Sequence, residues 1–126
     1  MKSYTDLEQS KRLAEILPLE SADMTYCAVT EGMREKMIIK NWEVNVGLDI
    51  AIKKNLFSYR NGYMIPCWSL AALFKMLPYS ARLERGSSTE LCSVTLPNEL
   101  ESSDWYIEPV DAAFEMLLKL HELKML

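Results

Sequence analysis

The sequence predicts a single α+β domain over residues 1–126, built from an antiparallel sheet of about five or six strands and three helices, two of which cover one face of the sheet. Three observations support this prediction. The 126 residues are 49% hydrophobic and 25% charged, which is typical of one globular domain with a sizeable core. Segments with apolar residues at helical spacing occur beside segments in which apolar and polar residues alternate. Proline and glycine lie between these segments, where short elements end.

The first helix is expected over about residues 6–17. The motif Thr5-Asp6-Leu7-Glu8 has the form of a capping box, in which the Thr5 hydroxyl accepts a hydrogen bond from the Glu8 amide. Pro18 ends the helix, because its ring excludes the helical conformation from the preceding residue. A run of strand-forming residues at 24–29 then predicts a strand that closes in a turn at Glu31-Gly32.

The next segment leaves two structures open. Residues 33–40 fit a helix, because Met33 and Met37 would share a face, and they fit a strand equally well, because residues 37–39 are strand formers. From Trp42 to Ile52 apolar and polar residues alternate, which predicts a strand with one solvated face. Gly47 would kink that strand, bulge it or divide it in two.

A hairpin and a helix follow. Asn61-Gly62 lies between two β-prone runs, so a hairpin is expected over residues 57–65. Pro66 ends the second arm of this hairpin and stands where the second helix would begin, and this helix is expected over about residues 67–77, ending at Pro78.

The last third of the chain predicts a second hairpin and a third helix. The hairpin joins residues 82–85 to residues 90–96, and a bulge near Cys92 would reconcile the broken alternation of its second arm. Residues 105–107 form a last short strand. Pro109 then opens a helix that runs to about residue 124.

Charge and cysteine content limit the function classes. The net charge of −4 argues against a general nucleic-acid binder, although residues 32–85 carry a net +5 between two acidic ends. No signal peptide and no apolar stretch of about 20 residues is readable, so a cytoplasmic protein with no membrane partner is expected. The three cysteines fit neither a disulfide framework nor a zinc motif, and we expect them reduced and mostly buried.

Candidate catalytic residues are sparse, and an enzyme is the weaker hypothesis. His121 is the single histidine and is expected at the end of the third helix, partly packed, since it follows Leu117 by four residues on the apolar stripe. A Cys67–His121 nucleophile pair would need Cys67 at the start of the second helix, where amide dipoles lower the pKa of a thiol. The acids Asp104, Glu108 and Asp111 precede or open the third helix, where the helix dipole explains them. No phosphate loop or metal motif is present, so the sequence predicts no catalytic residue, no cofactor and no metal.

Aromatic and basic residues in the middle of the chain are the better candidates for binding a partner. They combine rings that stack or anchor with nearby cations. The alternative is that Trp68 and Trp105 lie in the core and that the tyrosines are sheet neighbours. The candidate partner-binding residues are Trp42, Lys53, Lys54, Tyr59, Arg60 and Tyr63.

Four segments resemble a family of known sequences. They are residues 63–73 (YMIPCWSLAAL), residues 10–24 (SKRLAEILPLESADM), and the pair 109–113 and 119–123 (PVDAA and KLHEL). In these segments the chain resembles short uncharacterised proteins of gut Bacteroides and their prophages or other mobile elements. The resemblance implies an intracellular accessory protein of phage or mobile-element origin and transfers no catalytic residue. The Ile65-Pro66-Cys67-Trp68 part is expected to form a strand-to-helix corner with Trp68 packed over it.

The sequence therefore predicts a non-enzymatic protein-interaction module with an unidentified protein partner, compatible with a homodimer. The alternative is a nucleic-acid-associated accessory factor that uses the basic and aromatic residues of region 32–85.

Overall fold

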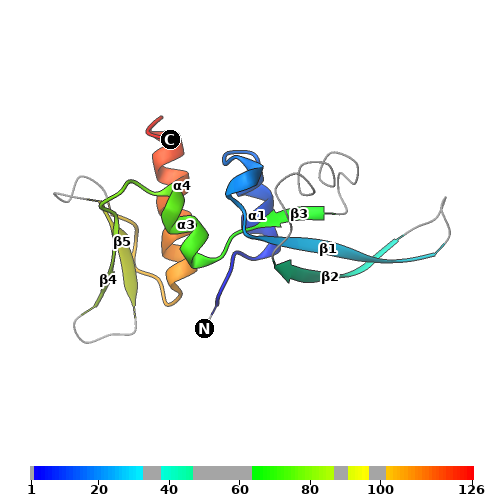
Figure 1. Ribbon diagram of the computed structural model, residues 1–126. Coiled ribbons are helices and arrows are strands. Elements are labelled where there is room, and N and C mark those ends of the chain that lie inside the picture. Colours follow the sequence, from blue (N-terminus) through cyan, green and yellow to red (C-terminus); the bar gives the residue numbers. More distant parts are fainter. Residues whose placement is uncertain (1, 33–37, 47–63, 87–90, 97–101) are drawn as a thin grey trace. The chain divides into compact units, whose positions relative to one another are not determined.

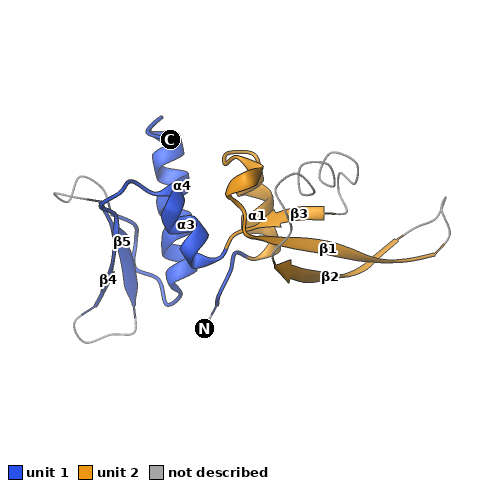
Figure 2. Ribbon diagram, in the orientation of Figure 1, with its two compact units in different colours: residues 1–5, 69–126 blue, residues 6–68 orange. Residues whose placement is uncertain are grey.

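A computed structural model describes residues 2–32, 38–46, 64–86, 91–96 and 102–126 (Figure 1). The described chain confirms an α+β protein with three α-helices and antiparallel sheets. Its contacts divide into two compact units (Figure 2). Unit 1 contains residues 1–5 and 69–126, and unit 2 contains the intervening residues 6–68. The chain therefore begins in unit 1, builds unit 2 as one continuous segment, and then completes unit 1. The expectation of a single domain stays a prediction.

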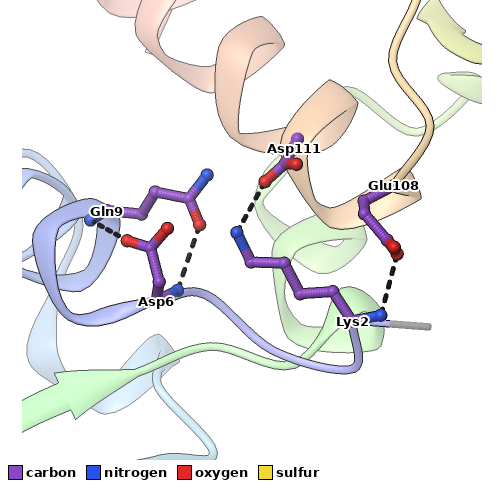
Figure 3. A network of polar contacts seen from close by, with 5 residues as sticks. All are labelled: Lys2, Asp6, Gln9, Glu108 and Asp111. Atoms are coloured by element: carbon purple, nitrogen blue, oxygen red, sulfur yellow. Dashed lines mark hydrogen bonds and ion pairs between the residues drawn. The ribbon is translucent and has the colours of Figure 1, made fainter.

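Unit 2 begins with helix α1, Leu7–Ala14, whose N-cap differs by one residue from the predicted cap. Asp6 is the cap: its Oδ1 accepts from the Gln9 amide at 2.8 Å, and the Gln9 side chain accepts from the Asp6 amide at 3.0 Å (Figure 3). The prediction of Thr5 with Glu8 was wrong. The pairs Thr5–Glu8 and Asp6–Gln9 both have the form of a capping box, a short polar residue followed three positions later by a long acceptor. Thr5 is fully buried and lies before the start of the helix. The helix ends three residues before the expected Leu17, and a 3₁₀ helix, η1, follows at Leu19–Ser21.

The sheet of unit 2 has the order β2-β1-β3, with both pairs antiparallel. Strand β1, Met24–Glu31, confirms the predicted strand, and Gly32 after it has a φ of 109°, which favours glycine. Strand β2, Ile38–Val46, decides between the two alternatives for residues 38–40 in favour of a strand. Residues 47–52 of the predicted alternating strand lie outside the described residues, as does the turn at Asn61-Gly62.

Strand β3, Met64–Cys67, pairs with β1 and leads directly to a corner before the next helix. The prediction that Pro66 opens a helix was wrong, because Pro66 lies inside β3 opposite Thr25. Proline has no backbone N–H to donate. It is tolerated in β3 because β3 is an edge strand of the described sheet, and the backbone groups on its outer side need no partner strand. Trp68 follows with no exposed surface, and its Nε1 donates to Ser21 Oγ at 2.9 Å. The expected strand-to-helix corner with a packed Trp68 is confirmed.

Unit 1 contains the second hairpin where the sequence predicts it. Strand β4, Arg82–Arg85, pairs antiparallel with β5, Cys92–Thr95, in one continuous register. The bulge proposed near Cys92 is therefore absent from the β4–β5 ladder. Every residue of β5 is buried, so neither face of the strand contacts solvent. The sequence therefore does not need to alternate strictly between apolar and polar residues.

The predicted strand at 105–107 is instead an irregular segment, residues 102–106, along the other edge of β5. It makes two isolated bridges, Cys92 to Tyr106 and Thr95 to Ser102. The bridged residues are three positions apart on β5 but four apart on the facing segment. This extra residue interrupts the ladder, so the irregularity lies in the partner of β5 and not in β5 itself.

Two helices complete unit 1. Helix α3, Leu70–Met76, begins after Ser69, whose Oγ accepts from the Ala72 amide at 3.2 Å. Helix α4, Pro109–Glu122, opens with proline at its first position, as predicted. Helix α4 packs on β5, and α3 packs on α4.

The described strands form a three-stranded and a two-stranded sheet, so one sheet of five or six strands is not confirmed. The reason is visible at β5: β4 lies on one of its edges and residues 102–106 on the other. A strand with both edges occupied cannot extend the sheet further.

Candidate functional site

The feature of this structure best suited to binding is strand β2. It pairs with β1 along one edge, and within the described chain no element pairs with its other edge. In Figure 1 the β1–β2 hairpin extends well beyond α1 and β3. An edge strand of nine residues presents a row of unpaired amide and carbonyl groups, which can form hydrogen bonds with a further strand.

A bulge determines which side chains of β2 share a face. Val29 pairs with Asn41, and the next residue, Thr30, pairs with Ile39, so Lys40 is an extra residue on β2. Ile39 and Trp42 would point to opposite faces of a regular strand, because they are three positions apart. The extra residue brings both onto one face. We call the resulting set the apolar row of β2: Ile39, Trp42, Val44 and Val46, which face Thr30, Ala28, Tyr26 and Met24 of β1.

The apolar row is substantially exposed. Val46 is 72% exposed and Ile39 is 42% exposed, while Trp42 and Val44 are half-buried. No charged residue belongs to the row. Exposed apolar side chains on an unpaired edge strand favour association with another chain over a solvated surface.

The other face of β2 is mostly polar. Lys40 belongs to it, since its Nζ lies 4.0 Å from an Oε1 atom of Glu31, which pairs with Ile38 on that face. Glu43 lies on the same face, opposite Cys27. Asn45 also lies there, and its Nδ2 donates to Cys27 Sγ at 3.2 Å. Strand β2 thus combines an apolar face, a polar face with one charge of each sign, and an edge that is open among the described residues.

Of the sequence-predicted binding residues, the structure describes only Trp42, and it lies in the middle of the apolar row. The other five lie outside the described residues: Lys53, Lys54, Tyr59, Arg60 and Tyr63. Sequence reasoning missed Ile39, Val44 and Val46 as binding candidates. Alternation correctly indicated that Val44 and Val46 share the face of Trp42, but that face was expected to be buried, and the bulge that adds Ile39 has no local sequence signal.

A second exposed apolar group lies in unit 1. Trp105 is 50% exposed and Ile107 is 66% exposed, so the expectation that Trp105 lies in the core was wrong. Tyr106, which lies between them in the sequence, is half-buried, and burial followed by the charge of Glu115 of α4 raises the pKa of its phenol. These two side chains stand on an irregular segment whose backbone already bonds β5, so they lack the open edge that β2 has.

The candidates for nucleophilic chemistry are arranged as structural residues. Cys67 is the buried last residue of β3, and α3 begins three positions later at Leu70. The prediction that Cys67 begins a helix was wrong, so Cys67 does not have the position at a helix start that the nucleophile hypothesis requires. His121 lies in the last turn of α4, as expected, but its side chain is exposed, whereas the sequence predicted that it would be partly packed.

In unit 1, the Cys92 thiol and the Tyr106 phenol both have raised pKa values, which favour their protonated forms. Burial raises the pKa of the Cys92 thiol, and the Glu108 carboxylate raises it further. The thiol donates to the Tyr106 carbonyl at 3.2 Å. Burial likewise raises the pKa of Tyr106, followed by the negative charge of Glu115. A protonated, bonded thiol is a poor nucleophile.

The acidic residues Glu108 and Asp111 at the start of α4 bind the start of the chain. The Lys2 amide donates to Glu108 Oε2 at 2.8 Å, and Lys2 Nζ donates to Asp111 Oδ1 at 2.7 Å (Figure 3). These contacts attach residues 2–5 to unit 1, where Tyr4 also bridges Ser69. Across the described ranges, no three histidine, cysteine or acidic side chains are grouped so as to hold a metal ion.

The chain matches no protein-family model, no curated protein and no solved structure. Within the described part, no helix is both long enough and apolar enough to span a membrane.

Proposed function

We propose that the chain is a non-enzymatic protein-interaction module that binds its partner by strand addition at β2. The single observation that carries the proposal is the apolar row on an edge strand that is unpaired within the described chain. In strand addition, main-chain hydrogen bonds supply affinity and the side chains of alternate residues supply specificity. The row Ile39, Trp42 and Val44 is suited to the second task.

We further propose that it acts inside a bacterial cell as an accessory protein of phage or mobile-element origin. This part rests on the resemblance of residues 10–24 and 63–73 to short proteins of gut Bacteroides and their mobile elements.

The nucleic-acid alternative has less support at this site. A two-stranded ribbon has dimensions that fit the major groove of DNA, but binding requires cations that face phosphates. The described hairpin carries Lys40 against two carboxylates, Glu31 and Glu43. The cations that the alternative needs, Lys53, Lys54 and Arg60, lie outside the described residues.

A capture experiment with matched variants tests the proposal. The full chain is used as bait in a nuclease-treated lysate of a Bacteroides host, beside Ile39→Lys and Leu83→Lys variants. Ile39 on β2 and Leu83 on β4 are similarly exposed, at 42% and 40%, so each new lysine is tolerated equally by the fold. A lysine on an edge strand opposes pairing with a further strand.

The expected result is a protein captured by wild type and by Leu83→Lys but not by Ile39→Lys. If Ile39→Lys captures the same proteins as wild type, β2 is not the binding strand and the proposal fails. If the chain captures proteins from an untreated lysate but none from the nuclease-treated lysate, the nucleic-acid alternative replaces the proposal.

A further inference from the structure

We infer that the partner that β2 accepts is β2 of a second copy of this chain, paired antiparallel about a two-fold axis at Trp42. The inference rests on the proposed function and names its partner. A two-fold interface requires a surface that is complementary to itself, because the same residues face each other from both copies. Strand β2 meets this requirement on both of its faces.

On the apolar face, the arrangement joins the apolar rows of the two copies. Trp42 faces Trp42 of the second copy, and Glu43 then faces Asn41. Lys40 is the bulge residue and has no directly opposite residue, as in the pairing with β1. The next pair is therefore Val44 of one copy with Ile39 of the other. The resulting row is continuous across the axis: Ile39, Trp42 and Val44 of one copy beside Val44, Trp42 and Ile39 of the other.

On the polar face, the charges of β2 are complementary. Lys40 and Glu43 are the only charged residues of the strand, and both lie on this face. In the register centred on Trp42, Lys40 of each copy lies beside Glu43 of the other. The two-fold axis repeats this contact, so the dimer gains two pairs of opposite charges.

Neighbouring registers are less favourable. A register centred on Glu43 places two carboxylates directly opposite each other, which is destabilising. A register centred on Val44 separates Lys40 from Glu43 and leaves residues 38–41 without partners among the described residues. The register at Trp42 pairs β2 from Ile38 to Asn45.

The extent of the contact sets the expected affinity. A strand of nine residues is about 30 Å long, and one strand-to-strand edge lies at the small end of specific interfaces. We therefore expect a reversible dimer with a dissociation constant on the order of 10 μM. Dimerisation would join two three-stranded sheets into one sheet of six strands.

Analytical ultracentrifugation of the full chain from about 1 to about 300 μM tests the inference. Wild type is expected to shift from monomer to dimer within this range. Glu43→Lys and Lys40→Glu should each raise the dissociation constant about tenfold, because each reversal replaces two attractive contacts with two repulsive ones. The double variant Lys40→Glu/Glu43→Lys should return to within about threefold of wild type, because the opposite charges meet again.

The charge-swap rescue distinguishes a second copy from any other partner, since only self-pairing brings position 40 beside position 43. A wild-type chain that is monomeric throughout the range overturns the inference. A dimer that Glu43→Lys leaves unchanged, or that the double variant does not restore, also overturns it. These outcomes leave the proposed function to be decided separately, by the capture experiment with Ile39→Lys.

Discussion

Strands β2 and β5 both contain apolar residues among polar ones, but they have opposite environments. Strand β5 has four residues, all buried, with β4 on one edge and residues 102–106 on the other. Strand β2 has nine residues, seven of them exposed, and a described partner on one edge only. The difference teaches that a strand's own residues do not decide whether it forms core or surface; the elements that pair with its edges and cover its faces do.

The largest expected effect comes from making the same substitution in both strands. Val94 of β5 has no exposed surface, whereas Val46 of β2 is 72% exposed. We expect Val94→Ala to lower the free energy of unfolding by about 1.5–3 kcal/mol, because a fully buried side chain is truncated. Val46→Ala should change it by less than about 0.5 kcal/mol. Chemical denaturation measures both, and equal losses would contradict the contrast between the strands.

A second substitution tests the cover on the outer edge of β5. Ser103 Oγ accepts from the Val94 amide at 2.9 Å and lies 3.2 Å from Ser93 Oγ. Ser103→Ala should cost about 1–3 kcal/mol of unfolding free energy, because it removes the acceptor of a buried amide. The exposed neighbour Ser102 provides the control, and Ser102→Ala should stay within about 0.5 kcal/mol. A Ser103→Ala chain as stable as the control would mean that residues 102–106 contribute little to the burial of β5.

A smaller effect is expected from the pH dependence of unit 1. Burial, and then the charge of Glu115, raises the pKa of Tyr106 above its ordinary value of 10.0. The protonated phenol is favoured in the fold, so its contribution is complete below pH 10.0 and is lost as pH rises through the raised pKa. The free energy of unfolding, measured below and above pH 10.0, should fall less steeply with rising pH for Tyr106→Phe than for wild type. Parallel pH profiles would rule out this role for Tyr106.

The smallest effect is expected on the polar face of β2. Asn45 Nδ2 donates to Cys27 Sγ at 3.2 Å, an exposed contact to a weak acceptor. Asn45→Ala should therefore change the free energy of unfolding by less than about 0.5 kcal/mol. A loss above about 1 kcal/mol would show that this face is part of the core, and the contrast with β5 would weaken.

The sequence predicted elements well where a local signal ends them. Helix α4 begins at Pro109 as expected, β1 closes at Gly32, and the β4–β5 hairpin lies within its predicted bounds. Predictions were poorer where two neighbouring frames looked alike. The cap of α1 is Asp6 with Gln9, one residue after the predicted frame, and Pro66 satisfies the rules for an edge strand as well as those for a helix start.

The candidate site was predictable only in part. Trp42 was correctly placed in an alternating strand, and the shared face of Val44 and Val46 follows from the same pattern. Its exposure, and the inclusion of Ile39, were not predictable. The bulge at Lys40 is set by the pairing of β2 with β1, and the open edge depends on which other strands the chain supplies.

The sequence by itself determined the element ends that proline or glycine marks, such as the start of α4 at Pro109 and the close of β1 at Gly32, because proline geometry and glycine conformations act over a few neighbouring residues. It also limited the chemistry, with a single histidine and three cysteines that fit no disulfide or metal motif. Only the tertiary structure decided that β5 is enclosed and that β2 keeps an apolar row beside an edge that no described residue pairs with. Those properties depend on contacts between residues far apart in the chain, which no local pattern encodes.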